Sequence, residues 1–307
     1  MATEPILAAF DVAVVQRRRF SAVWSDYWAL TKPEVNFLIV VTTFAGFYLG
    51  DAGQWRDFPF LLSINAVLGT LLVASGTGTL NQYIERQFDA QMRRTARRPL
   101  AAGRLEPSAV LWFGIALSVA GSVYLAVAVN LLSSVLAIAT LLSYLFFYTP
   151  LKRKTPLCTL VGAFPGAMPP LIGWAAASGK LTFEAWTLYA VLFLWQFPHF
   201  MAIAWMYRED YDRAGYQVLP HDARARARFV KWQTRLPLLA LVPLSLLPAL
   251  AGASRTFWIG ALLLSLGFLY YGAQFVVNKS GATARRLLAA SIIYLPLQFV
   301  LIVLSRG

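Results

Sequence analysis

The chain has 307 residues, of which 58% are hydrophobic and 13% are charged, and its mean hydropathy is +0.59. Soluble domains average roughly 45–50% apolar and about 25% charged residues. The composition therefore excludes an ordinary soluble protein. Because the apolar residues form long runs, we expect an all-α polytopic membrane protein.

Nine segments are long and apolar enough to cross a bilayer, which takes about 20 residues per helix. In chain order, the predicted transmembrane helices are 34–50, 58–82, 107–128, 131–148, 157–177, 184–206, 236–253, 256–277 and 287–304. The least distinct boundary is at Asn130, where we favour two spans joined by a tight turn. We expect residues 1–33 to form a cytoplasmic N-terminal segment and residues 34–307 to form one transmembrane domain.

The distribution of basic residues predicts the orientation and argues against nucleic-acid binding. The net charge is +13, but with the N-terminus inside, 23 of the 27 Lys and Arg residues lie in segments expected to be cytoplasmic. The four on the other side are Arg56, Lys180, Arg255 and Arg306. This asymmetry follows the positive-inside rule. We therefore expect a multi-pass protein of the cell (inner) membrane, with its N-terminus and its site loops on the cytoplasmic side.

The N-terminus and the single cysteine carry little functional signal. We expect no cleavable signal peptide, because the first apolar stretch contains Asp11 and precedes the basic residues 17–19. Cys158 is the only cysteine, which excludes an intramolecular disulfide and a cysteine-based metal motif. We expect it to be a small packing residue.

Asn81, Glu85 and Asp89 carry three oxygen-bearing side chains to the point where the second span meets a basic loop. On a helix, this i, i+4, i+8 spacing places them within about 80° of one another. Converging hard oxygen ligands suit Mg²⁺, which commonly bridges carboxylates to phosphate oxygens. A solvated helix face is the alternative, but Asn81 follows an apolar stretch. We therefore predict a metal–diphosphate site here.

Two cationic segments accompany this triad. The first is the cluster Arg93, Arg94, Arg97 and Arg98. Topology alone could explain it, but arginines bind phosphate bidentately, and we expect at least two of the four to do so. The second is the turn from Tyr148 to Pro156, which prolines restrict on both sides. This restriction favours a defined cationic role for Lys152 or Arg153, and an interfacial tyrosine with topogenic lysines is the alternative.

His199 lies within the sixth span, seven residues from its inner end, or roughly 10 Å deep at about 1.5 Å per residue. An ionisable residue at that depth is a functional candidate, and a buried histidine bonded to a backbone carbonyl is the alternative. On an unbroken helix His199 and Asp210 would share a face, although Pro198 can kink it. A ligating imidazole needs a partner for its other nitrogen, and Gln196 is a candidate.

Asp210 belongs to a second acidic cluster, which follows the sixth span and includes Glu209 and Asp212. We predict that Asp210 binds a second Mg²⁺ opposite the first triad, and a loop of mixed charge is the alternative. Each acidic cluster follows an even-numbered span and precedes arginines, which indicates two similar halves. Transporters contain comparable repeats, so this symmetry does not select an activity.

These motifs resemble the UbiA superfamily of intramembrane prenyltransferases over nearly the whole chain after residue 25. Four blocks carry the resemblance: 81–99 with its Arg-Thr-x-x-Arg-Pro ending, 148–156, 162–174 with Gly-Ala-x-Pro-Pro, and 198–211 with Pro-His-Phe and Arg-Glu-Asp-Tyr. The last block points to the branch that farnesylates heme. Two features differ from the family pattern. Met206 and Ala214 stand where a second Asp often accompanies Asp210, and Glu85 replaces a frequent Asp.

The resemblance implies a helical bundle around a central cavity that binds farnesyl diphosphate with Mg²⁺. In the implied reaction, cations stabilise the departing diphosphate, a vinyl group of heme B attacks the allylic cation, and water addition gives heme O. Heme B is then a substrate and Mg²⁺ the cofactor. A heme A synthase or a cytochrome oxidase assembly factor is a candidate partner, beside the lipid bilayer.

The candidate residues fall into three overlapping groups. The candidate catalytic residues are Asn81, Glu85, Asp89, Lys152 and Asp210. The candidate substrate-binding residues are Arg93, Arg97, Arg98, Arg153, Tyr148, His199 and Arg208. The candidate metal ligands are Asn81, Glu85, Asp89 and Asp210.

Two other functions are compatible with these patterns. A UbiA-type enzyme that prenylates an aromatic quinone precursor would have no evident use for His199, whereas an imidazole suits an iron porphyrin. A secondary transporter of an anionic solute should contain broken helices and polar sites at the membrane midplane. The charged residues here instead lie near the inner interface, which favours an enzyme.

Overall fold

The computed structural model describes residues 20–51, 57–247 and 255–305, and these residues form helices and connecting turns without a β-strand. The helices are α2 (Phe20–Leu30), α3 (Pro33–Gly50), α4 (Phe60–Asp89), α5 (Pro107–Ala128), α6 (Leu131–Leu142), η2 (Ser143–Tyr148), α7 (Thr149–Leu151), α8 (Cys158–Gly166), α9 (Met168–Ser178), α10 (Phe183–Met206), α11 (Arg208–Arg213), α12 (Ala223–Leu244), α13 (Arg255–Val277) and α14 (Gly281–Leu304). In this part of the chain, eight helical segments are long and apolar enough to cross a membrane. The prediction of an all-α polytopic membrane protein is confirmed.

The eight segments coincide with eight of the nine predicted spans, and the prediction for 236–253 differs from the structure. There, α12 begins well before the predicted span, at Ala223, because Asp222 caps it by accepting a hydrogen bond from the Ala225 amide at 2.6 Å. The first half of α12 is rich in arginine, so hydropathy marks only its apolar second half. Residues 248–253 of the predicted span lie outside the described residues.

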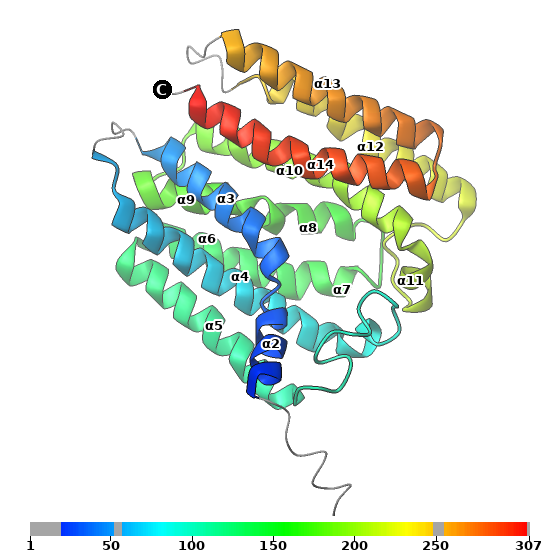
Figure 1. The fold of residues 1–307 in the computed structure, drawn as a ribbon, viewed down its shortest axis with the longest axis horizontal. Helices are drawn as coiled ribbons and strands as arrows, with labels where there is room; N and C mark the ends of the chain where they lie inside the picture. Colours follow the sequence, from blue (N-terminus) through cyan, green and yellow to red (C-terminus); the bar gives the residue numbers. More distant parts are fainter. Residues whose placement is uncertain (1–19, 52–56, 248–254, 306–307) are drawn as a thin grey trace, which may run out of the picture.

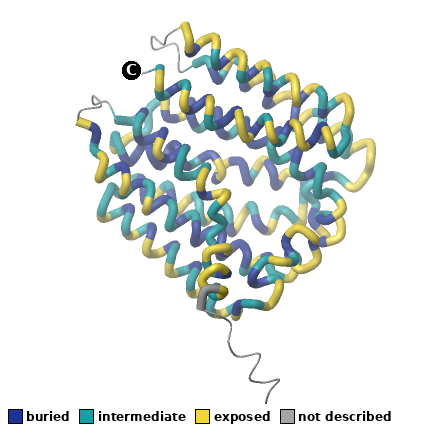
Figure 2. The backbone as a smooth tube through the Cα atoms, viewed as in Figure 1, coloured by how far each residue is buried: buried dark blue, intermediate teal, exposed yellow. Residues whose placement is uncertain are grey.

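The long helices lie side by side in one bundle (Figure 1). Helix α4 packs on α5, α3 packs on α9, and α10 packs on both α12 and α14. The central helices α9 and α10 are mostly buried, whereas the outer faces of α5 and α13 are exposed (Figure 2). The exposed side chains on α5 include Trp112, Val119, Val123 and Val127. An apolar outer surface of this kind suits contact with lipid rather than with water.

Glycines allow α3 and α9 to approach closely. Gly46 lies against the backbone of Pro170, and Gly173 lies against the Thr43 carbonyl, at positions where a Cβ atom would overlap the neighbouring backbone. Small residues at a helix interface are typical of membrane proteins, where close packing replaces the hydrophobic effect as the driving force. This contact holds α3 in place, and with it the residue that precedes α3, Lys32.

Two backbone irregularities occur at the same end of the bundle. Residues Ser143–Tyr148 form a π-helix, η2, between α6 and α7, and such turns are frequent at functional sites. Lys32 has φ 55° and ψ 60°, and it is the one non-glycine residue in the described ranges with positive φ. Strain of this kind persists only where surrounding contacts enforce it. Both irregularities therefore direct attention to this end of the molecule.

The fifth predicted span is interrupted between α8 and α9 at Ala167. Its backbone nevertheless stays hydrogen-bonded, because the Ala167 amide donates to the Ala163 carbonyl at 3.1 Å. The side chain of Gln196 also donates to that carbonyl, at 3.0 Å. The interruption is thus a closed kink and not an open gap in the backbone.

Candidate active site

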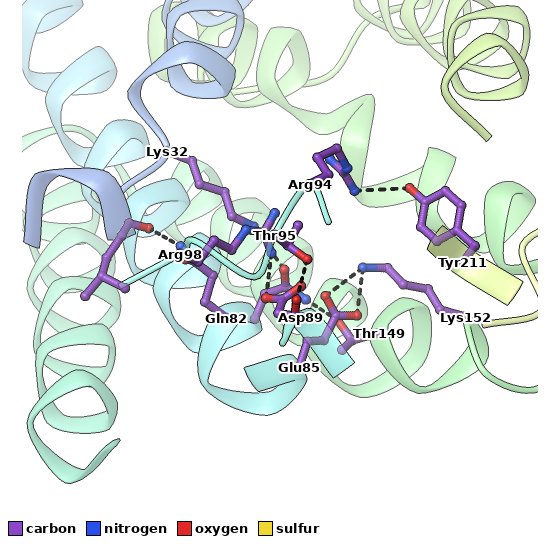
Figure 3. A network of polar contacts seen from close by, with 12 residues as sticks. Lys32, Gln82, Glu85, Asp89, Arg94, Thr95, Arg98, Thr149, Lys152 and Tyr211 are labelled. Carbon is purple, nitrogen blue, oxygen red and sulfur yellow. Dashed lines mark hydrogen bonds and ion pairs between the residues drawn. The ribbon is translucent and has the colours of Figure 1, made fainter. Parts of the chain in front are cut away.

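The C-terminal end of α4 carries the predicted oxygen triad on a buried face. Asn81, Glu85 and Asp89 are 1%, 5% and 1% exposed, respectively. Because α4 is continuous through all three, the i, i+4, i+8 spacing places them on one side of the helix, as the sequence predicted. In Figure 3, the Glu85 and Asp89 side chains lie next to each other inside one network of polar contacts.

Each carboxylate of the triad is paired with a cation from another segment. Lys152, which follows α7, donates from Nζ to both oxygens of Glu85, at 2.8 and 3.1 Å. Arg98, in the loop after α4, donates from Nη1 to Asp89 Oδ2 at 2.7 Å. Two of the predicted cations therefore lie where the sequence placed them, beside the carboxylates.

Lys32 is a site residue that the sequence analysis missed. Its Nζ donates to Asn81 Oδ1 at 3.0 Å, and Asn81 Nδ2 donates in turn to Thr149 Oγ1 at 3.3 Å. Burial, together with repulsion from Arg98 and Lys152, lowers the pKa of Lys32 to about 7. The signal that could have identified Lys32 is its place directly before the proline that opens the first span, where the chain turns from α2 into α3.

Lys152 is held on several sides. Burial would lower its pKa, but the adjacent Glu85 carboxylate outweighs burial and holds the pKa of Lys152 well above its ordinary value. The Tyr148 ring centroid lies 4.7 Å from Nζ, and Tyr144 packs edge-on against Tyr148 at 4.9 Å. The Lys152 carbonyl accepts a hydrogen bond from the Gln217 amide at 2.7 Å. Lys152 is therefore a charged and well-ordered group between a carboxylate and an aromatic face.

Asp210 connects the second acidic cluster to the loop after α4. It is 8% exposed, and it accepts hydrogen bonds from the Arg94 amide at 3.3 Å and from Arg213 Nη1 at 3.1 Å. Arg94 also donates to the Tyr211 hydroxyl at 3.3 Å (Figure 3). Its guanidinium lies over the Tyr207 ring, 5.0 Å from the centroid. Arg94 belongs to the predicted arginine cluster, but it was not among the candidate substrate-binding residues, and its contact with Asp210 was not predicted. Its neighbours are on α11 and at Tyr207, which directly precedes α11, and local spacing cannot reveal them.

The other predicted cations have different surroundings. Arg93 and Arg97 are exposed. Arg153 is also exposed, and its guanidinium stacks 4.2 Å above the ring of Phe88 on α4. In the described part of the chain, none of these three arginines forms an ion pair with Glu85 or Asp89, so their role in substrate binding stays a prediction.

Arg208 makes local contacts. Its guanidinium donates to the Trp205 carbonyl at 2.9 Å and to Glu209 Oε1 at 3.2 Å. Its partners thus come from its own segment of the chain. Arg208 lies two residues before Asp210, but these contacts do not include Asp210. The role of Arg208 in substrate binding likewise stays a prediction.

His199 lies at the contact between α10 and α14. Its Nδ1 is 2.7 Å from Ser291 Oγ, and its ring stacks on Trp195 with a centroid distance of 4.5 Å. The predicted partner Gln196 is wrong, because its amide donates to backbone carbonyls of Ala163 and Leu192 instead. The alternative of an imidazole held by a backbone carbonyl is also not what the structure contains, since the partner is a hydroxyl.

The predicted continuous face from His199 to Asp210 is wrong as well. Helix α10 ends at Met206, and Tyr207, with φ −109° and ψ 20°, separates it from α11. The 100° periodicity of one helix therefore does not extend to Asp210.

Comparison with known proteins identifies the family. A model described as the UbiA prenyltransferase family matches residues 39–295. The chain belongs to this family. It is 50% identical over 291 residues to the protoheme IX farnesyltransferase of Solibacter usitatus (strain Ellin6076), covering 92% of this chain and 98% of that protein. It is 41% identical over 303 residues to the protoheme IX farnesyltransferase of Koribacter versatilis (strain Ellin345), covering 95% and 96%.

Solved structures share the same fold. Digeranylgeranylglyceryl phosphate synthase superimposes with a TM-score of 0.72 at 15% identity, over 92% of this chain and 98% of that chain. A UbiA homolog from Archaeoglobus fulgidus bound to GPP and Mg²⁺ has a TM-score of 0.59 at 16% identity, over 90% and 99%. At these identities the likeness shows the fold alone. The predicted UbiA-like helical bundle is confirmed, and the chain is an intramembrane prenyltransferase of this family.

Proposed function

We propose that this UbiA-family chain transfers the farnesyl group of farnesyl diphosphate to a vinyl group of heme B, giving heme O and diphosphate. The observation that carries the proposal is the cation cluster of Lys32, Arg98 and Lys152, which surrounds the carboxylates of Glu85 and Asp89. The similarity to relatives named protoheme IX farnesyltransferase supports heme as the acceptor.

The cation cluster provides a binding site for the diphosphate. Three cationic side chains face two carboxylates, so the cluster has one positive charge in excess when all five groups are ionised. A diphosphate would offset the mutual repulsion of these cations, and Arg98 can bind phosphate oxygens bidentately. The two carboxylates are buried and the three cations are partly buried, and low local polarity strengthens such contacts.

The same residues fit a magnesium ion. Asp89 Oδ1 is buried and has no hydrogen-bond partner in the described part of the chain, so a cation would satisfy an oxygen that is otherwise unpaired. The described ranges contain no group of three His, Cys, Asp or Glu residues arranged for a metal. Mg²⁺ does not need one, since it is usually bound by one or two carboxylates with water and substrate phosphates. The residues that would hold it are Asn81, Glu85 and Asp89, and Asp210 would hold a second ion.

The chain's own groups then assist departure of the diphosphate. When bound, Mg²⁺ would neutralise charge on the leaving group. Lys152 and Arg98 are ordered before substrate binds, so they stabilise the developing negative charge without reorganisation. The vinyl group of heme B forms a carbon–carbon bond with the allylic cation, and water adds to the resulting heme-side cation and loses a proton. Exclusion of bulk water before that step protects the allylic cation from hydrolysis.

His199 is the residue that we propose positions heme B. It is partly buried within α10, and Trp195 stacks on its ring. Neutral imidazole is a good iron ligand. His199→Ala should raise the apparent heme requirement and change the heme absorption spectrum, while farnesyl diphosphate binding is retained. A phenolic acceptor would need no such ligand.

The orientation and the partners are also proposals. The loop after α4, the turn after α7 and α11 lie at one end of the bundle (Figure 1) and are rich in basic residues. The positive-inside rule places such loops in the cytoplasm, which corresponds to an inner-membrane protein with a cytoplasmic diphosphate site. A heme A synthase or a cytochrome oxidase assembly factor is the candidate recipient of heme O.

The test is direct. Purified protein is incubated with heme B, farnesyl diphosphate and Mg²⁺, and the heme is analysed by mass spectrometry. We expect a mass increase corresponding to one farnesyl group plus one hydroxyl group, because a vinyl group of heme B becomes a hydroxyethylfarnesyl group. Prenylation of 4-hydroxybenzoate instead of heme would replace the proposal with the quinone-precursor alternative. Solute uptake without any prenylation would favour the transporter, although the kink at Ala167 is closed by its own hydrogen bond.

A further inference from the structure

Ser291 on α14 makes two short contacts through one hydroxyl group. Its Oγ lies 2.6 Å from the Leu288 carbonyl oxygen and 2.7 Å from His199 Nδ1. The residue is fully buried, so water does not compete for either contact. The direction of each hydrogen bond decides which nitrogen of His199 carries the proton.

The hydroxyl has one hydrogen, and the carbonyl oxygen has none. The contact between Ser291 and Leu288 is therefore attractive only when Ser291 donates. Its Oγ must then accept from His199, so Nδ1 carries the proton. The Nε2 atom is left with a free lone pair, and it forms no hydrogen bond within the described residues.

Trp195 also restricts the orientation of the His199 imidazole ring. Its indole Nε1 donates to the Ser291 carbonyl at 2.8 Å, and its ring stacks on the imidazole of His199 at an interplanar angle of 26°. Ser291 is thus bonded to two consecutive turns of α10, through its hydroxyl to His199 and through its carbonyl to Trp195. The imidazole can neither tilt freely nor exchange its tautomer without breaking one of these bonds.

We propose that Ser291 is a positioning residue for the heme substrate: it holds His199 as the Nδ1–H tautomer and presents Nε2 to the heme iron. This inference rests on the proposed function, in which heme B is the acceptor. A histidine ligates iron through an unprotonated nitrogen, and a hydrogen bond from its other nitrogen orients the ring and raises its basicity.

The first experiment is a heme B titration of the purified full-length protein, followed by the Soret band. Loss of an outer-shell partner typically weakens metal binding by about 10–100-fold, so Ser291→Ala should weaken heme binding by that factor and shift the spectrum. Farnesyl diphosphate binding should be unchanged. The matched control is Ser118→Ala, which removes a buried α5 hydroxyl that donates to the Gly114 carbonyl at 2.8 Å and has no histidine partner.

The second experiment tests the proton itself and does not depend on Ser291→Ala alone. In His199→Gly, added imidazole can ligate iron and donate an N–H to Ser291, whereas 1-methylimidazole can ligate but cannot donate. Imidazole should restore the heme spectrum at about tenfold lower concentration than 1-methylimidazole. This preference should disappear in His199→Gly combined with Ser291→Ala.

The outcomes separate the inference from the proposed function. If His199→Ala alters heme affinity and spectrum but Ser291→Ala alters neither, the inference is overturned and the heme role of His199 stands. Equal rescue by the two imidazoles in His199→Gly overturns it as well. If His199→Ala changes neither heme affinity nor spectrum, the assignment of His199 to heme fails, and the inference fails with it.

Discussion

The backbone amide of Arg94 donates to Asp210 Oδ2 at 3.3 Å and joins two motifs that are 116 residues apart in the sequence. Arg213 holds the other oxygen of the same carboxylate. Asp210 therefore connects the loop after α4 to α11. In this position it can order the loop that carries Arg98 toward the α4 carboxylates, in addition to the proposed contact with Mg²⁺.

Asp210→Ala should lower prenyl transfer and weaken its Mg²⁺ dependence. The substitution removes a buried acceptor and the attachment of the loop, and we expect a loss of roughly 10–100-fold, as is typical for groups that orient a metal site. Steady-state rates across a Mg²⁺ titration measure it. Asp212→Ala is the matched control, since Asp212 lies on the same helix but is exposed. Equal and mild effects of the two changes would show that this helix is only a solvated charge cluster.

Asp89→Asn should reduce single-turnover prenyl transfer by about 10²–10³-fold, the range seen when one electrostatic group is removed from an active site. The change keeps the shape of the side chain but removes the charge that pairs with Arg98 at 2.7 Å. Glu209→Gln, which neutralises an exposed carboxylate, should have little effect. Full activity of Asp89→Asn at limiting Mg²⁺ would contradict the metal assignment.

The sequence predicted the elements that depend on local pattern. Eight spans and the buried face of Asn81, Glu85 and Asp89 follow from apolar run length and from helical periodicity, and both are properties of a single helix. The start of α12 was mispredicted because hydropathy ignores a helix that begins among basic residues and enters the apolar region later.

The contacts that were not predicted join distant segments of the chain. Lys32 reaches Asn81 only because the chain turns sharply before α3, and Arg94 meets Asp210 only because a loop folds over α11. The partner of His199 was mispredicted for the same reason. The nearest polar neighbour in sequence was Gln196, whereas the neighbour in space is Ser291 on α14.

Gly173→Ala should destabilise the protein by about 1–3 kcal/mol, as overpacking usually does. An added Cβ would overlap the Thr43 carbonyl of α3. This carbonyl is a backbone group, so it cannot move aside as the end of a flexible side chain could. Thermal unfolding in detergent measures the effect. Gly267→Ala is the control, because a Cβ at that position of α13 meets no atom within 4 Å. That variant should match or exceed the wild type, since alanine favours helix over glycine by up to about 1 kcal/mol.

Lys32→Gln should raise the KM for farnesyl diphosphate by about tenfold or more, a change that corresponds to about 1.4 kcal/mol of binding free energy. Glutamine can still donate to Asn81, so the local hydrogen bond is kept while the positive charge is lost. The heme B titration should be unchanged, because His199 and its partner lie on α10 and α14.

Two further variants distinguish the effect of the positive charge of Lys32 in the site from the effect of positive charge at the membrane surface. Lys154→Gln removes an exposed lysine of the neighbouring basic turn and should leave the KM near its original value. Lys32→Arg keeps the charge and should retain most of the farnesyl diphosphate affinity. An equal rise in KM for Lys32→Gln and Lys154→Gln would mean that the basic loops attract the diphosphate through their summed field. The partly buried contact of Lys32 with Asn81 would then serve only the folding of the turn before α3.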